Sequence, residues 1–230
     1  MTSTLGTKSS TQDHTSERTI TVTNRTIRIT AIVDGVVRGV AKHWLLIANA
    51  VLSLYAGLPA LAPVLMATGH TSAARLIYTL FLPLCHQLPE RSFFLLGPQP
   101  TYTLTELEGL VGSTVPLRYT GGPGLGYKMA VCQRDLATFL AALVAGLAFT
   151  LLRRRLRPLS IKAFVLLCIP IALDGFGQLL ALWESTWWSR VFSGAIFGVA
   201  CVWLTYPYIE SGMKDVLRLA EQVQSGETTS

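Results

Sequence analysis

Two short segments of the chain, residues 84–94 and 126–135, hold the side chains best suited to chemistry. They combine thiols, an imidazole, guanidinium groups and a carboxylate: Cys85, His86, Arg91, Cys132, Arg134 and Asp135. Both segments lie beside strongly apolar stretches, where a buried polar group is costly unless it has a partner. The sequence therefore predicts a polar site in an apolar protein.

Thiolate, imidazole and carboxylate groups are the usual protein ligands of zinc. We therefore consider a transition-metal site, with zinc as the example, whose candidate ligands are Cys85, His86, Cys132 and Asp135. The sequence has no Cys-x-x-Cys pair, and the adjacent Cys85 and His86 could both bind one ion only with strained geometry. The alternatives are a disulfide between Cys85 and Cys132 and a nucleophilic thiol paired with His86.

A second group of polar residues surrounds Asp174, which shares one face of an apolar helical segment with Gln178. An unpaired carboxylate in such a segment costs about 2.5 to 3.5 kcal/mol, so we expect a cationic partner. The candidate partners are Arg91, Arg134 and Arg190. In the structural interpretation, these residues form an ion-pair network that holds the helices in register.

In the functional interpretation, the same groups form a site for an anion or a headgroup. Its candidate catalytic residues are Asp174, Arg134 and His86, with Asp174 as a general base or a metal ligand. Its candidate substrate-binding residues are Arg91, Gln178 and Arg190. Three functions follow as hypotheses: a metal-assisted or thiol-dependent membrane enzyme, a binding or assembly module, and a component for transport of small solutes. The apolar inner halves of the spans argue against transport.

The composition places the chain in a membrane. Of the 230 residues, 50% are hydrophobic and only 14% are charged, which is too apolar for an ordinary soluble domain. The net charge of +6 comes from basic residues that cluster beside apolar runs, as membrane topology requires. We expect the lipid bilayer as a partner, a second membrane protein or another copy of the chain as further hypotheses, and no nucleic acid, because no basic patch is interleaved with aromatic residues.

The hydrophobic pattern predicts an all-α fold, a polytopic transmembrane helical bundle of about four spans. The spans are residues 44–66, 136–152, 161–182 and 191–208. Residues 73–85 are too few to cross comfortably and predict a short re-entrant or interfacial helix. The domain is residues 31–210, with a long polar loop over 87–134 that contains a short helix near 105–111 and a flexible glycine-rich turn at 121–126. Flexible tails are expected at 1–30 and 211–230.

Basic residues predict the orientation in the membrane. The strongest cluster, Arg153 to Arg157 with Lys162, connects two spans and is expected in the cytoplasm. With four spans, both termini are then cytoplasmic and the polar site lies at the outer face of the cell membrane. A topology with five spans and an outside N-terminus is the alternative.

The joint pattern of these motifs resembles an uncharacterised family of small polytopic prokaryotic membrane proteins, catalogued as a domain of unknown function. The resemblance covers roughly Leu76 to Tyr208 and rests on Cys-His-Gln, Arg-Ser-Phe, Cys-x-Arg and Asp-Gly-x-x-Gln. It implies a membrane location and the importance of these positions, and it names no activity. Some members carry a second cysteine where this chain has Asp135, which weakens an all-thiolate metal site.

Overall fold

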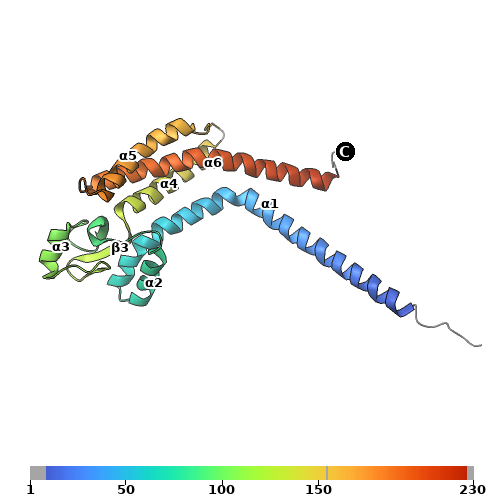
Figure 1. Cartoon of the computed structure of the whole chain (residues 1–230), viewed down its shortest axis with the longest axis horizontal. Coiled ribbons are helices and arrows are strands. Elements are labelled where there is room, and N and C mark those ends of the chain that lie inside the picture. The colour runs from blue at the N-terminus through green and yellow to red at the C-terminus, as the bar shows by residue number, and fades with distance from the viewer. Residues whose placement is uncertain (1–8, 154, 227–230) are drawn as a thin grey trace, which may run out of the picture. The chain divides into compact units, whose positions relative to one another are not determined.

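The computed structural model describes residues 9–153 and 155–226, which form six α-helices, one 3-10 helix and three short strands. Residues 45–210 form one compact unit, which contains every predicted site residue. In chain order the elements are α1 (Ser9–Ala67), α2 (Thr71–Phe81), the 3-10 helix (Pro89–Arg91), β1 (Ser92–Leu95), α3 (Leu104–Val111), β2 (Gly121–Gly122), β3 (Gly126–Cys132), α4 (Gln133–Leu152), α5 (Ile161–Leu179) and α6 (Trp187–Ser225) (Figure 1).

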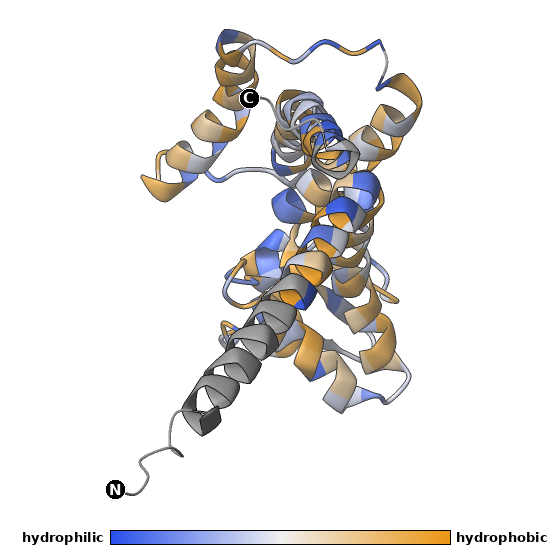
Figure 2. Ribbon diagram, turned by 90° about the vertical axis from the view of Figure 1, so that its right-hand side faces the viewer, coloured by the Kyte–Doolittle hydropathy of each residue, from blue (hydrophilic) through white to orange (hydrophobic). Residues whose placement is uncertain are grey.

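Among the described residues, four helical segments are long and apolar enough to cross a membrane. They are Arg28–Ala67, Gln133–Leu152, Ile161–Leu179 and Trp187–Gln222. Figure 2 shows hydrophobic residues along much of the helical ribbon. Large apolar side chains stay exposed on these helices, for example Leu166 at 65% and Leu173 at 60% on α5. Such faces suit lipid rather than water. The predicted all-α, polytopic helical fold is confirmed.

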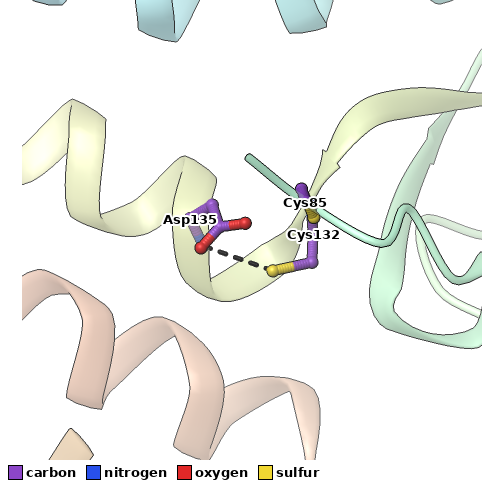
Figure 3. A group of neighbouring side chains, drawn as sticks. All are labelled: Cys85, Cys132 and Asp135. Atoms are coloured by element: carbon purple, nitrogen blue, oxygen red, sulfur yellow. Dashed lines mark hydrogen bonds between the residues drawn. The ribbon is translucent and has the colours of Figure 1, made fainter. Parts of the chain in front are cut away.

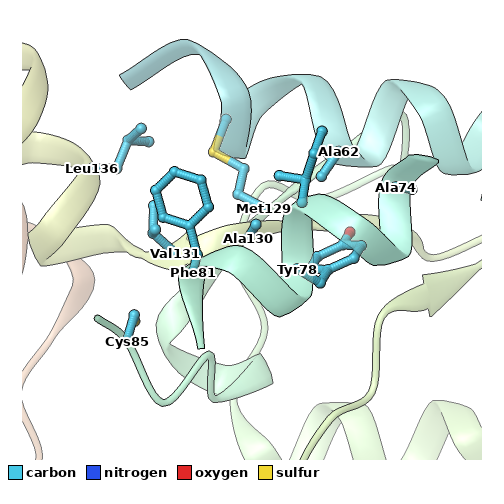
Figure 4. Close-up of a cluster of buried hydrophobic side chains, with 10 residues drawn as sticks. Ala62, Ala74, Tyr78, Phe81, Cys85, Met129, Ala130, Val131 and Leu136 are labelled. Atoms are coloured by element: carbon cyan, nitrogen blue, oxygen red, sulfur yellow. The ribbon is translucent and has the colours of Figure 1, made fainter. Parts of the chain in front are cut away.

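The short apolar segment between the first two predicted spans is α2, a helix of 11 residues that is too short to cross a membrane. Its buried side chains recur at the period of one helix face: Ala74, Ile77, Tyr78 and Phe81. They pack with the end of α1 and with β3 in one hydrophobic cluster, whose other buried members include Ala62, Met129, Ala130, Val131 and Leu136 (Figure 4). This packing fixes α2 on the central strand.

Both outer helices extend further than the sequence predicts. The composition predicts flexible tails at residues 1–30 and 211–230, whereas α1 begins at Ser9 and α6 continues to Ser225. Helix formation is cooperative, so an apolar helix can extend into a polar flank that contains no helix breaker. Residues 9–30 contain neither glycine nor proline. The remaining tail residues, 1–8 and 227–230, lie outside the described part of the chain.

Residues 87–134, predicted as a long polar loop, contain an antiparallel sheet in the order β1, β3, β2. The expected short helix near 105–111 is present as α3. The glycine-rich turn, expected to be flexible, instead joins β2 to β3 and packs its backbone closely against the end of β1. Gly126 has a φ of +84°, and a Cβ there would lie 2.5 Å from the carbonyl oxygen of Leu95. Only glycine fits such a position.

A closed ring of three hydrogen bonds fastens the segment after α2 to β3. The Tyr78 hydroxyl donates to the Lys128 carbonyl oxygen (2.5 Å), Lys128 Nζ donates to the Gln87 carbonyl oxygen (2.6 Å), and Gln87 Nε2 donates to the Tyr78 carbonyl oxygen (2.6 Å). All three residues are buried. Each bond satisfies a backbone carbonyl that would be costly to bury alone. We call this arrangement the Tyr78–Lys128–Gln87 ring.

The buried lysine of this ring predicts a pH dependence of stability. Burial lowers the pKa of Lys128 from 10.5 to about 8. Between these values the unfolded chain binds more protons than the folded chain, so the free energy of unfolding rises with pH. Relative to Lys128→Met, which removes this titration, we expect the free energy of unfolding of the wild type to rise by about 2 kcal/mol from pH 8 to pH 10.

The measurement is unfolding in a neutral detergent, followed by far-ultraviolet circular dichroism at several pH values. Burial also raises the pKa of Tyr78, whose loss of stability begins only above its ordinary value of 10.0, so the window ends there. Because the Cys85 thiolate interacts with the Lys128 ammonium, both proteins carry Cys85→Ser in this comparison. Equal slopes for wild type and Lys128→Met would contradict the assignment.

Candidate functional site

Three of the predicted metal ligands come together where β3 passes into α4. One ligand atom each from Cys85, Cys132 and Asp135 lies within 4.8 Å of the others. Cys85 follows α2, Cys132 ends β3, and Asp135 lies in the first turn of α4 (Figure 3). The backbone N–H of Cys132 donates to the Cys85 sulfur (3.2 Å), and that of Asp135 donates to the Cys132 sulfur (3.5 Å). We call these residues the thiol cluster.

The two thiols of the cluster differ in acidity because their side chains share a hydrogen bond, in addition to the backbone N–H bonds described above. The hydrogen bond from Cys132 lowers the pKa of the Cys85 thiol, and the same bond raises the pKa of the Cys132 thiol. Cys85 is therefore the first of the two to ionise. A thiolate is the form of cysteine that binds metal or acts as a nucleophile.

Two expectations about this cluster differ from the structure. His86 is exposed and is not one of the three clustered residues, because the chain is non-helical here and successive side chains alternate between buried and exposed over Cys85, His86 and Gln87. Both Cys85 and Cys132 are free thiols, so the disulfide alternative is not the state of this structure.

The cationic partner of Asp174 is Arg134. Arg134 Nη2 donates to one carboxylate oxygen of Asp174, while the hydroxyls of Ser185 and Ser189 donate to the other, each at 2.6 Å. The Asp174 side chain is only 6% exposed and that of Arg134 19% exposed. The carboxylate thus receives donors from three parts of the chain: α4, the connection before α6, and α6 itself.

The connection between α5 and α6 brings these serines to Asp174. Past the end of α5, Ala181 adopts the left-handed conformation with φ of +53°, and the N–H of Leu182 bonds back to the Gly177 carbonyl oxygen (2.9 Å). This reverses the chain, as at many helix C-termini. The Thr186 hydroxyl then accepts from the N–H of Ser189 (3.3 Å) and caps α6. Ser185 and Ser189 consequently flank the start of α6 and face Asp174.

Arg190 is held beside α4 by neutral acceptors. Its Nη1 donates to the side-chain oxygen of Gln133 (3.1 Å) and to the carbonyl oxygen of Glu90 (3.3 Å), and its Nε has no hydrogen-bond partner. Gly194 and Gly198, four residues apart on α6, allow the two helices to approach closely, because a Cβ on Gly194 would lie 2.5 Å from the Arg134 carbonyl oxygen. Arg190 is only 7% exposed.

A pocket of about 1020 Å³ opens beside Arg190, and we call it the arginine pocket. Three residues predicted to bind substrate, Arg91, Gln178 and Arg190, line it. Asp174 and the thiol cluster do not line it. Apart from His86, the predicted site residues therefore fall into three groups: the thiol cluster, the Arg134–Asp174 ion pair and the arginine pocket.

Sequence reasoning missed two residues that position the others, Lys128 and Gln133. Both are 1% exposed, Lys128 in the hydrogen-bonded ring and Gln133 as the acceptor from Arg190. Both lie in the segment 126–135, Gln133 as the middle residue of Cys-x-Arg, and an amide or ammonium in such an apolar setting was the available signal.

The buried ion pair predicts a strong energetic coupling between Arg134 and Asp174. Arg134→Ala leaves a buried carboxylate without its cation, so we expect a loss of about 3 kcal/mol in the free energy of unfolding. A double-mutant cycle with Asp174→Ala should give a coupling free energy of about 2 kcal/mol. The control cycle uses the exposed pair Arg218 and Asp215, for which about 0.5 kcal/mol or less is expected. Equal couplings in the two cycles would refute a stabilising role for the buried pair.

Comparison with known proteins gives a match in the second half of the chain. Residues 124–204 match the family described as "Predicted membrane protein (DUF2085)". Over 174 residues the chain is 26% identical to a protein of Methanocaldococcus jannaschii named "Uncharacterized protein MJ1492", an alignment that covers 72% of this chain and 92% of that protein. No solved structure matches the chain. The resemblance to an uncharacterised family of membrane proteins is confirmed, and the matched residues include Cys132, Arg134, Asp174 and Arg190.

Proposed function

We propose that the protein is a membrane protein that binds one transition metal ion, zinc in the first instance, through Cys85, Cys132 and Asp135. The observation that carries this proposal is the approach of three ligand atoms to within 4.8 Å of one another. In a tetrahedral zinc site with bonds of about 2.0 to 2.3 Å, ligand atoms lie roughly 3.3 to 3.8 Å apart. A small contraction of the thiol cluster would therefore enclose an ion.

The surroundings of the thiol cluster support this ligand set. Cys85 has the lowered pKa that favours a thiolate. The N–H donors of Cys132 and Asp135 would remain on the two sulfurs and hold them in place, as groups around a metal site commonly do. Because Cys85 is buried and its neighbour His86 is exposed, His86 is left out of the ligand set.

Three protein ligands leave one position of a tetrahedral ion open to water or a substrate, as in catalytic zinc sites. This supports a metal-assisted membrane enzyme over a closed structural site. Arg134 lies two residues after Cys132 and directly before Asp135, so the Arg134–Asp174 pair would border the metal and hold the first turn of α4 in position. We propose that this end of the bundle faces outward and that both termini are cytoplasmic, as the basic residues between α4 and α5 favour.

Metal content tests the ligand set. Protein purified in detergent without chelator, after growth with added zinc, should contain about one metal ion per chain by elemental analysis. Cys85→Ser and Cys132→Ser should lose it, and Asp135→Asn should bind it more weakly because a neutral amide is a poorer ligand than a carboxylate. The matched controls are Cys168→Ser and Cys201→Ser, whose cysteines lie in α5 and α6 outside the cluster.

A thiol count under denaturing, non-reducing conditions accompanies the metal measurement. Metal that is retained in all three cluster variants would refute the ligand set. Absence of metal together with two unreactive thiols, in the wild type and in both Cys168→Ser and Cys201→Ser, would instead establish a disulfide between Cys85 and Cys132.

Labelling from outside the cell tests the orientation. Ser113 and Ser211 are both exposed, the first in the connection between α3 and β2 and the second on α6 beyond Glu210. In a background with all native cysteines replaced by serine, Ser113→Cys should react with a membrane-impermeant maleimide on intact cells. Ser211→Cys should react only after permeabilisation. The reverse pattern would place the site in the cytoplasm.

A further inference from the structure

The arginine pocket lies apart from the thiol cluster and is not used by the proposed metal site. Its wall combines Arg91 and Arg190 with polar side chains from the start of α4, the end of α5 and the connection between α5 and α6, namely Gln133, Gln178 and Ser185. Its volume of about 1020 Å³ is far larger than a single small ion needs. The pocket is therefore of a size to take a whole organic molecule that the arginines anchor.

Arg190 is the anchor because its guanidinium is buried and some of its N–H donors have no hydrogen-bond acceptor in the chain. It is 7% exposed, and its two hydrogen bonds both leave from Nη1 to neutral oxygens. Its Nε has no partner, and no carboxylate forms an ion pair with it among the described residues. A guanidinium offers its donors in a planar fork that fits two oxygens of one phosphate or carboxylate group.

Gln133 fixes the orientation of that fork. It is 1% exposed, and its Nε2 donates to the Ser92 carbonyl oxygen (3.3 Å), so its Oε1 must be the atom that accepts from Arg190 Nη1. The amide thus holds one side of the guanidinium and leaves Nε unpaired. Arg91, whose side chain is 38% exposed, adds a second positive charge at the pocket and is only loosely paired with Glu90 at 3.8 Å.

We propose that the arginine pocket binds the phosphate group of a larger, partly apolar molecule, with Arg190 as the main anchor and Arg91 as the second cation. Tyr102, Trp183 and Trp187 line the same pocket and offer apolar surface to the rest of that molecule. Three carboxylates, Glu90, Glu106 and Glu184, also line it. They disfavour a polyanion, so the ligand carries a single phosphate group.

Binding to the full-length protein in a neutral detergent tests this proposal. The readout is tryptophan fluorescence, because Trp183 and Trp187 line the pocket. The probes are inorganic phosphate, added against a sodium chloride titration of equal ionic strength, and phosphatidic acid in mixed micelles, compared with micelles of the neutral detergent alone. We expect the tryptophan fluorescence to change and to saturate as the concentration of at least one probe increases.

Variants of the two arginines identify the site. Arg190→Lys keeps the charge and loses the fork, so binding should weaken by about tenfold or more. Arg91→Gln changes a half-exposed side chain and should fold even if the buried position does not tolerate lysine; binding should weaken in it too. The matched control is Arg118→Gln. Arg118 is an exposed arginine between α3 and β2, and it does not line the pocket. It should bind as the wild type does.

Each outcome decides the proposal. Saturable binding of inorganic phosphate that weakens in Arg190→Lys or Arg91→Gln supports it and indicates a soluble phosphate compound. Binding of phosphatidic acid alone, with the same variant effect, supports it and indicates a lipid headgroup. No saturable change with either probe, or equal binding by wild type and both arginine variants, overturns it. Cys85→Ser removes the proposed metal ligand and should leave these results unchanged, so failure of one proposal is separate from failure of the other.

Discussion

The Tyr78–Lys128–Gln87 ring is the interaction on which the rest of the site depends. The non-helical segment after α2 is hydrogen-bonded to β3 by this ring and by the Cys132 N–H, which donates to the Cys85 sulfur. The ring thus helps to hold Cys85 next to Cys132, 47 residues later in the chain. Each member donates its side chain to the backbone of the next, so the loss of one bond leaves a buried carbonyl oxygen unsatisfied. Tyr78 also belongs to the hydrophobic cluster between α2 and β3, and the exclusion of water there strengthens the hydrogen bonds of the ring.

Because β3 passes directly into α4, three consecutive residues at the start of α4 make contacts with three different groups of the site. Successive side chains of a helix point about 100° apart, so Gln133, Arg134 and Asp135 leave the first turn of α4 in different directions. Gln133 meets Arg190, Arg134 meets Asp174, and Asp135 joins the thiols. One short stretch of chain thus connects the sheet, α5 and α6. The position of Cys132 at the N-cap of α4 fixes all three directions at once.

The sequence predicts those parts of this arrangement that depend on local pattern. Length and hydropathy identify the spans, and the cost of an isolated carboxylate predicts a cation beside Asp174, which is Arg134. The sheet escaped prediction because its pairing joins residues far apart, such as Ser92 and Cys132. The exclusion of His86 from the thiol cluster depends on which way a short extended segment turns, and nothing in the neighbouring residue types decides that. The amide of Gln133 in an apolar setting indicates a polar partner, but that the partner is Arg190, 57 residues later, depends on how α6 packs on α4.

Asp174, Lys128 and Arg190 are buried residues with side chains that are ordinarily charged, and they meet the cost of burial in different ways. Asp174 receives a cation and two hydroxyl donors from the chain itself. Lys128 has a carbonyl oxygen and the Tyr78 ring as neutral partners, and burial lowers its pKa to about 8, so it can release its proton at modest cost. Arg190 has neither remedy, because its partners are neutral and a guanidinium stays protonated at any physiological pH. Its charge is the one of the three that the described chain leaves without either an ionic partner or a route to neutrality, and an anion bound in the arginine pocket would supply that partner.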